Sequence, residues 1–153
     1  MKKLSVNPIF KAIVLISAVF WCTSTIAAPK DGIHRLVIHV DDNEPKRMNM
    51  ALNNAVNVDK YYNSKGEEVI IEIVAYGPGL IMLHADKSPV KERITSFGEN
   101  YTNISFRACG NTLKTMSKKA GKEVSLLPQA KMVQSGVVHI IQRQEEGWSY
   151  VRP

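Results

Sequence analysis

The sequence predicts an α/β fold, a three-layer sandwich with a mostly parallel five-stranded sheet, formed by a single domain. Two observations indicate this class. Short, almost continuous apolar runs are typical of strands in a parallel sheet that is covered on both faces. Between these runs lie segments whose apolar residues recur at helical spacing, and alternating strands and helices indicate an α/β fold. The sequence shows no internal repeat and no low-complexity tract, and nothing in it indicates a second domain.

Five apolar segments are predicted as strands. They comprise residues 36–40, 69–75 and 103–108, a short segment at 131–133, and the C-terminal segment 148–151. Because four intervening segments are long enough for helices, we expect parallel strands joined by helical crossovers.

The first predicted helix has apolar residues at i, i+3, i+4, i+7 and i+8, namely Met48, Ala51, Leu52, Ala55 and Val56. Asp42 or Asn43 can cap its start, Pro45 lies near its first turn, and Gly66 follows its end. A stripe of Asn49, Asn53 and Asn57 at i+4 spacing indicates a solvated face, a subunit interface or the polar wall of a site.

Three further helices are predicted from their start and stop signals. The second opens at Ser88-Pro89 and stops at Gly98, and the third spans residues 111–119. The fourth opens at Ser135-Gly136 and ends at Gly147.

Residues 1–27 are predicted to be a secretory signal, leaving 28–153 as the folded domain. The chain starts Met1-Lys2-Lys3, continues into an apolar run at 12–21, and reaches small residues ending at Ala27. Cleavage after Ala27 predicts a periplasmic or secreted protein. An uncleaved membrane anchor is the alternative, since the run approaches the ~17 residues that span a bilayer, but the polar residues 23–25 favour cleavage.

Removal of this signal changes the charge and the cysteine count. Three of the six formal positive charges lie on lysines of the signal, so the remaining chain is at +3, a mildly basic surface that does not indicate nucleic-acid binding. Of the two cysteines, Cys22 lies in the signal and Cys109 remains. A lone thiol in an oxidising compartment is buried and inert, paired between chains, or reactive.

The carboxyl ends of the strands form the predicted functional edge, because ligands of open α/β sheets bind there. Cys109 lies at the end of one strand and just before a helix, where unpaired backbone N–H groups and the helix dipole favour a thiolate. The alternative is that Cys109 is an unreactive, buried apolar side chain. The residues expected to line a site are His39, Asp42, Gly77, Gly79, Arg107, Gly110, Asn111, Thr112 and Ser135.

Other chemistries are weakly indicated. Arg107 shares a side of its strand with Cys109, so it either stabilises the thiolate or forms a salt bridge. His39 with Asp41 and Cys109 could bind a metal, although a structural histidine is favoured. Gly77-Pro78-Gly79 lacks the third glycine of a dinucleotide site and is interpreted as a loop approached by a neighbouring helix. We therefore expect no cofactor.

Several motifs in order resemble the DsrE/DsrF-like family across essentially the whole mature chain. They are residues 36–40 followed by Asp42, then 51–54, 75–79, 108–112, 135–137 and 144–153. The resemblance implies a five-stranded parallel α/β fold and homo-oligomers, commonly trimers or hexamers. It also implies that a strand-end cysteine, in the general placement of Cys109, carries sulfane sulfur as a persulfide.

The sequence thus predicts an exported DsrE-like sulfur carrier or sulfurtransferase, with a sulfur donor or acceptor protein as its partner. In this reading the Cys109 thiolate attacks a sulfane sulfur, holds it and passes it to an acceptor thiol, while Asn111 and backbone N–H groups stabilise the sulfur anion. The alternative is a non-catalytic, oligomeric binding module that uses the same edge for a small ligand or metal.

Overall fold

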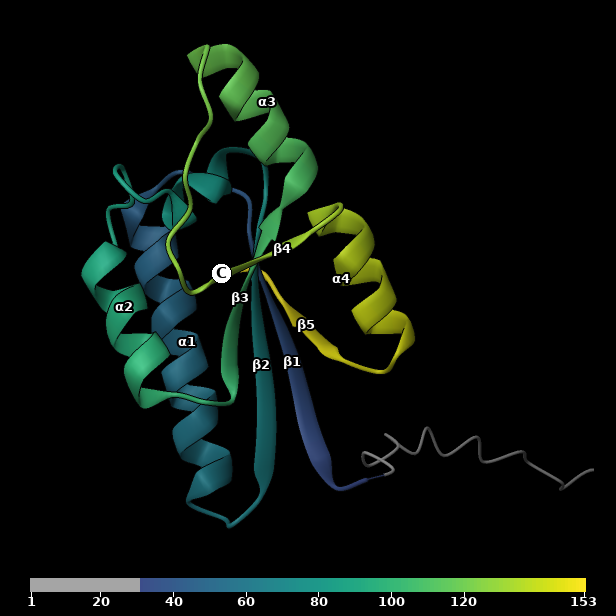
Figure 1. The fold of residues 1–153 in the computed structure, drawn as a ribbon. Helices are drawn as coiled ribbons and strands as arrows, with labels where there is room; N and C mark the ends of the chain where they lie inside the picture. Colours follow the sequence, from purple (N-terminus) through teal and green to yellow (C-terminus); the bar gives the residue numbers. More distant parts are fainter. Residues whose placement is uncertain (1–30) are drawn as a thin grey trace, which may run out of the picture.

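Five parallel strands form one sheet in the order β4-β3-β2-β1-β5 (Figure 1). The computed structural model describes residues 31–153, so the predicted signal with Cys22 lies outside the described residues. The strands are β1 Ile33–Val40, β2 Glu68–Ala75, β3 Ile104–Cys109, β4 Ala130–Val133 and β5 Ser149–Val151. All five predicted strands are confirmed, and the sheet is entirely parallel.

Within residues 31–153, four α-helices and one 3-10 helix connect the strands. They are α1 Pro45–Asn63, the 3-10 helix η2 Gly77–Leu83, α2 Lys91–Asn100, α3 Gly110–Ala120 and α4 Gly136–Glu145. Several local predictions were wrong. Helix α2 runs through its predicted stop at Gly98 and ends at Asn100. The glycine turn is the start of η2 rather than a loop, and Glu44 rather than Asp42 or Asn43 is the N-cap of α1. Asp42 instead accepts a hydrogen bond from the backbone N–H of Glu44 at 2.8 Å.

The main core lies on the sheet face covered by α1, η2, α2 and α3. Alternate residues of the three central strands point into it, and helix residues such as Met48, Leu80 and Ile94 pack against them. Full burial of one such side chain contributes about 1.5–3 kcal/mol. The rest of the main cluster includes Leu36, Ile38, Leu52, Ile71, Ile73, Phe97, Phe106 and Leu127.

Among residues 31–153, α4 is the one helix that covers the other face of the sheet (Figure 1). Its buried apolar cluster is small and consists of Val37, Val74 and Ile140, with Tyr76 and Trp148 partly buried beside them. Glu72 and His39 are also buried on this face, since they alternate with the main-core residues of β2 and β1. The α4 face therefore combines a small apolar cluster with buried charged and polar groups.

At the carboxyl ends of β3 and β4, the chain leaves the sheet toward opposite faces. From β3 the chain enters α3, whose Leu113 and Met116 pack on the main core, whereas from the adjacent β4 it enters α4 on the opposite face. Adjacent strands whose connections leave to opposite faces open a crevice, where open α/β sheets bind ligands. Cys109 is the last residue of β3 and lies at this crevice.

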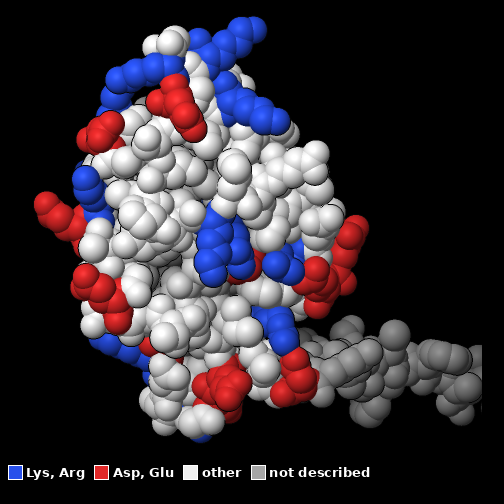
Figure 2. All heavy atoms as spheres, viewed as in Figure 1, with Lys and Arg blue, Asp and Glu red and all other residues white. Residues whose placement is uncertain are grey.

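Charges on the viewed surface are mixed. Figure 2 shows lysine, arginine and acidic side chains interspersed around a broad uncharged area, with no extended field of one sign on this face. Within residues 31–153, no helix is both long enough and apolar enough to cross a membrane.

Candidate functional site

Cys109 ends β3 and is the N-cap residue of α3, as the sequence predicts, with only 5% of its surface exposed. The next residue must be small. A Cβ on Gly110 would lie 3.1 Å from the carbonyl oxygen of Val133 and 3.4 Å from that of Gln134. Glycine at this position lets the end of β4 approach the start of α3 closely.

A second helix begins against the same cysteine. A Cβ on Gly136, the first residue of α4, would lie 3.3 Å from Cβ of Cys109 and 2.9 Å from Cβ of Tyr76. Ser135 is the N-cap of α4, and its side chain makes no capping hydrogen bond. The N-termini of α3 and α4 therefore both meet at Cys109, where their dipoles favour negative charge.

The surroundings of Cys109 favour its thiolate. Burial raises the pKa of the thiol, but the nearby Thr112 hydroxyl and the nearby backbone N–H groups of Gly136, Thr112 and Asn111 outweigh burial, so the pKa lies below its ordinary value. The Thr112 hydroxyl also accepts a hydrogen bond from the backbone N–H of Gly77 at 3.0 Å. Thr112 thus connects the thiol to the start of η2.

Two hollows lie on either side of Asn111. The β3–β4 hollow, of about 580 Å³, is lined by Asn111, Val133, Gln134, Ser135, Val138, His139 and Gln142. The η2–α3 hollow, of about 560 Å³, is lined by Asn43, Gly77, Pro78, Ile81, Asn111, Thr112, Thr115, Met116 and Lys119. Cys109 lines neither hollow, but its β4 neighbour Val133 lines the first and Thr112 lines the second.

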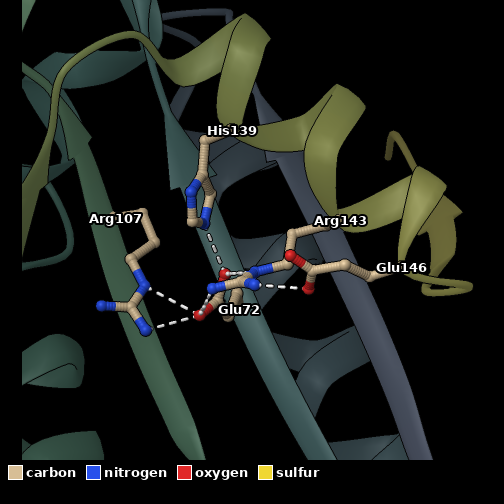
Figure 3. A network of polar contacts seen from close by, with 5 residues as sticks. All are labelled: Glu72, Arg107, His139, Arg143 and Glu146. Atoms are coloured by element: carbon tan, nitrogen blue, oxygen red, sulfur yellow. Dashed lines mark hydrogen bonds and ion pairs between the residues drawn. The ribbon is translucent and has the colours of Figure 1, made fainter.

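Glu72 is the centre of a buried charge network under α4 (Figure 3). Its side chain is 3% exposed and accepts hydrogen bonds at 2.9 Å from Nε of Arg107, 2.6 Å from Nε2 of His139 and 2.9 Å from Nε of Arg143. Arg143 also binds Glu146. Burial raises the pKa of Glu72, but the bonds from Arg143, Arg107 and His139 outweigh burial and lower it. Glu72 is therefore a paired, buried carboxylate.

Arg107 belongs to this network. Its Nε and Nη2 both bind Glu72, which corresponds to the salt-bridge alternative from the sequence. The guanidinium reaches Glu72 because β2 and β3 are neighbouring strands whose side chains here share the α4 face.

His39 lies at the same edge of the sheet but faces β5. Its Nδ1 is 2.7 Å from the hydroxyl of Tyr150, and its ring stacks on Tyr76 with centroids 4.6 Å apart. Its Nε2 is 3.7 Å from Asp41, too far for a hydrogen bond, and is buried without a partner. Burial outweighs the attraction of Asp41 and lowers the pKa of His39. This is a neutral histidine held in place by its neighbours.

The metal set considered from the sequence is not assembled. Among residues 31–153, no group of three histidine, cysteine, aspartate or glutamate side chains is arranged to hold a metal ion. Asp41 is instead held by Arg152, whose Nη2 lies 2.9 Å from its carboxylate.

The remaining predicted residues divide into two groups. Gly77, Gly110, Asn111, Thr112 and Ser135 surround Cys109 or line the adjoining hollows. Asp42 lies apart on the surface beside Arg47. A Cβ on Gly79 would lie 2.3 Å from the carbonyl oxygen of Val40, so the element that approaches this glycine is the end of β1, not a helix as predicted.

Sequence reasoning missed Glu72 and His139. Glu72 carries one signal, since it is the one charged residue within the predicted apolar strand 69–75. A charge in such a strand indicates a buried partner or a site. His139 has Arg143 at i+4, which places both on one helix face, but nothing local indicates Glu72 as their common partner.

Comparisons with known proteins include a shorter solved structure that matches most of this chain. No protein-family model matches the sequence, and no curated protein matches it either. A solved structure described as the protein of unknown function MTH1491 from Methanobacterium thermoautotrophicum is 34% identical, with a TM-score of 0.67. The match covers 78% of this chain and 99% of that one. The chain therefore belongs to the same family as MTH1491 of Methanobacterium thermoautotrophicum.

Proposed function

We propose that this protein is an exported, DsrE-like sulfur carrier or sulfurtransferase that holds sulfane sulfur as a persulfide on Cys109. The observation that carries the proposal is the meeting of two helix N-termini at this thiol, in surroundings that lower its pKa. The motifs that resemble the DsrE/DsrF-like family support the same reading.

The chemistry requires a nucleophilic sulfur and a stabilised sulfur anion. The thiolate of Cys109 attacks a sulfane sulfur, and the resulting persulfide passes it to an acceptor thiol. A persulfide sulfur lies about 2 Å beyond Sγ, within the region where the helix dipoles and N–H groups favour negative charge. The low exposure of Cys109 protects a bound persulfide from solvent.

The proposal includes a homotrimer or homohexamer. Parallel sheets are almost always covered on both faces, whereas one ten-residue helix covers the α4 face here. Three apolar side chains of α4 face solvent, namely Val137, Val138 and Ile141. A second copy of the chain would cover them, and a donor or acceptor protein would meet the free edge beside Cys109.

Export to the periplasm or beyond, with cleavage after Ala27, is part of the same proposal. N-terminal sequencing of the exported protein tests it. A chain that still starts at Met1 and remains in the membrane would contradict cleavage.

A non-catalytic binding module is the second candidate. The η2–α3 hollow supports it, because its amide, hydroxyl and apolar lining with Lys119 at one side suits a small organic ligand. Such a module would not need Cys109.

Intact mass separates the two candidates. Treatment with polysulfide should add one sulfur atom to the wild type, a reductant should remove it, and Cys109→Ser should never acquire it. Equal behaviour of wild type and variant would contradict sulfur transfer and leave the binding module.

A further inference from the structure

The imidazole of His139 joins the buried charge network to the β3–β4 hollow. His139 is on the first turns of α4, its side chain is 12% exposed, and it lines the hollow beside Asn111 and Ser135. Its Nε2 is bound to Glu72 at 2.6 Å. Figure 3 shows the other ring nitrogen on the side of β3, away from Glu72.

The pairing with Glu72 determines the tautomer of His139. A carboxylate only accepts hydrogen bonds, so Nε2 carries the proton and the neutral ring has its lone pair on Nδ1. A ring oriented in this way by a carboxylate can accept a proton at Nδ1 and return it.

The charges around the ring keep Glu72 ionised. Arg107 reaches it from β3, and Arg143 reaches it from α4. Glu146 binds Arg143 from the same helix, and Lys131 of β4 is paired in register with Arg107. In the part of the chain that the structure describes, Glu72 is the one carboxylate bound to the imidazole, so it is the group that orients the ring.

The hollow itself suits a small sulfur compound. Its lining offers amides and a hydroxyl from Asn111, Gln134, Ser135 and Gln142, two valines, and no carboxylate. A volume of about 580 Å³ is in the range of small-molecule sites. The lining lies next to the cysteine at two residues. Val133 is paired in register with Cys109, and Ser135 precedes Gly136, which contacts Cys109.

We propose that the β3–β4 hollow receives low-molecular-weight thiols, persulfides and disulfides, and that His139, positioned by Glu72, exchanges the proton on their sulfur. The proposal rests on the proposed function of Cys109 as a sulfur nucleophile.

The step balances without an oxidant or reductant. Sγ of Cys109 attacks the terminal sulfur of a persulfide R–S–S–H, a new S–S bond forms, and the original S–S bond breaks. The electron pair of the broken bond stays on R–S⁻, which takes a proton from Nδ1 of protonated His139 and leaves as R–SH. The proton of the new Cys109 persulfide then returns to Nδ1. With a disulfide R–S–S–R the same attack gives a mixed disulfide, and R–S⁻ is protonated in the same way.

Two neutral disulfides test the role of His139. Hydroxyethyl disulfide releases a basic alkyl thiolate that needs a proton, whereas a pyridyl disulfide releases a stable thiolate that does not. His139→Gln keeps a donor toward Glu72 and removes the ring nitrogen that faces away from Glu72. We expect about a hundredfold slower reaction of Cys109 with the alkyl disulfide and less than about threefold change with the pyridyl disulfide.

His34→Gln is the matched control, because His34 also binds a glutamate, Glu67 at 3.0 Å, but lies near the start of β1 and does not line the hollow. It should leave both rates unchanged. A second variant, His139→Ala, should recover its alkyl rate when free imidazole is added.

Equal slowing with both disulfides would show that His139 only holds α4 in place, and it would overturn the proposal. So would unchanged rates, or a wild type that does not react with the alkyl disulfide. Mixed disulfides form without sulfane sulfur, so these results are independent of whether Cys109 holds a persulfide, which polysulfide labelling tests separately.

Discussion

Gly136 and Cys109 are in such close contact that a Cβ on the glycine would lie 3.3 Å from the Cβ of the cysteine. The same Cβ would lie 2.9 Å from two atoms of Tyr76. The start of α4 is therefore placed against the thiol by the absence of a side chain, and the N–H of Gly136 can contribute to the lowered pKa of Cys109.

Gly136→Ala should displace the start of α4. Relief of the clash with Tyr76 and Cys109 moves the N–H of residue 136 away from the sulfur, so the pKa of Cys109 rises, and overpacking costs about 1–3 kcal/mol of stability. Alkylation rate against pH and thermal unfolding measure both effects. Ser135→Ala is the control, since the Ser135 side chain makes no capping bond; the prediction fails if both variants titrate like the wild type.

Thr112→Val should raise the pKa of Cys109 and leave the volume of the side chain at position 112 almost unchanged. It removes the hydroxyl that binds the thiolate and also the acceptor of the Gly77 N–H, which costs about 1 kcal/mol. The midpoint of the alkylation curve should move to higher pH. Thr115→Val, one turn later, loses only a bond to the carbonyl of Asn111 and should leave that midpoint in place.

The limits of sequence reasoning follow from the same residues. Each strand was predicted from a continuous apolar run, because burial of both faces of a parallel sheet requires apolar residues along each strand. The position of Cys109 between strand and helix was likewise local. Glu72 and His139 are 67 positions apart, and their pairing depends on α4 crossing the sheet from β4 to β5, which no local pattern encodes. The 3-10 helix η2 was missed because Gly-Pro-Gly also marks loops.

Glu72→Gln should destabilise the fold most at neutral pH. The pKa of Glu72 is lower in the folded state, so its contribution is complete above the ordinary value of 4.5 and is lost as pH falls through the folded pKa. Removing the charge leaves Arg107 without its carboxylate and Arg143 with Glu146 alone, and it costs about 3 kcal/mol at pH 7. Urea unfolding across pH measures this. Glu146→Gln, at an exposed carboxylate, should cost less than about 1 kcal/mol.

Tyr150→Phe should leave His39 buried with no partner at either ring nitrogen. The lost bond to Nδ1 costs about 1–3 kcal/mol, since Nε2 already lacks a hydrogen-bond partner.

The pKa of His39 is lowered in the fold, so the unfolded chain binds the extra proton and stability falls as pH drops below the ordinary value of 6.5. His39→Gln should remove that part of the pH dependence. Unfolding curves between pH 5 and 8 measure it, and a retained slope would contradict a neutral His39.

Oligomerisation should depend on α4 rather than α1. The asparagine stripe of α1, one sequence candidate for an interface, is partly occupied within the chain, because Arg93 of α2 binds the side chains of Asn49 and Asn53 at 2.6 and 2.8 Å. Ile141 of α4 and Met50 of α1 are apolar and similarly exposed, at 49% and 47%. They therefore form a matched pair for a charge substitution.

Ile141→Glu should reduce the oligomer to smaller species, because a carboxylate in an apolar interface loses its hydration without gaining a partner. Met50→Glu should not change the mass, since its charge stays in water. Light scattering at micromolar concentration measures both, and circular dichroism checks that each variant is folded. A wild type that is monomeric, or an oligomer that Met50→Glu disrupts and Ile141→Glu does not, would exclude α4 as the contact between copies.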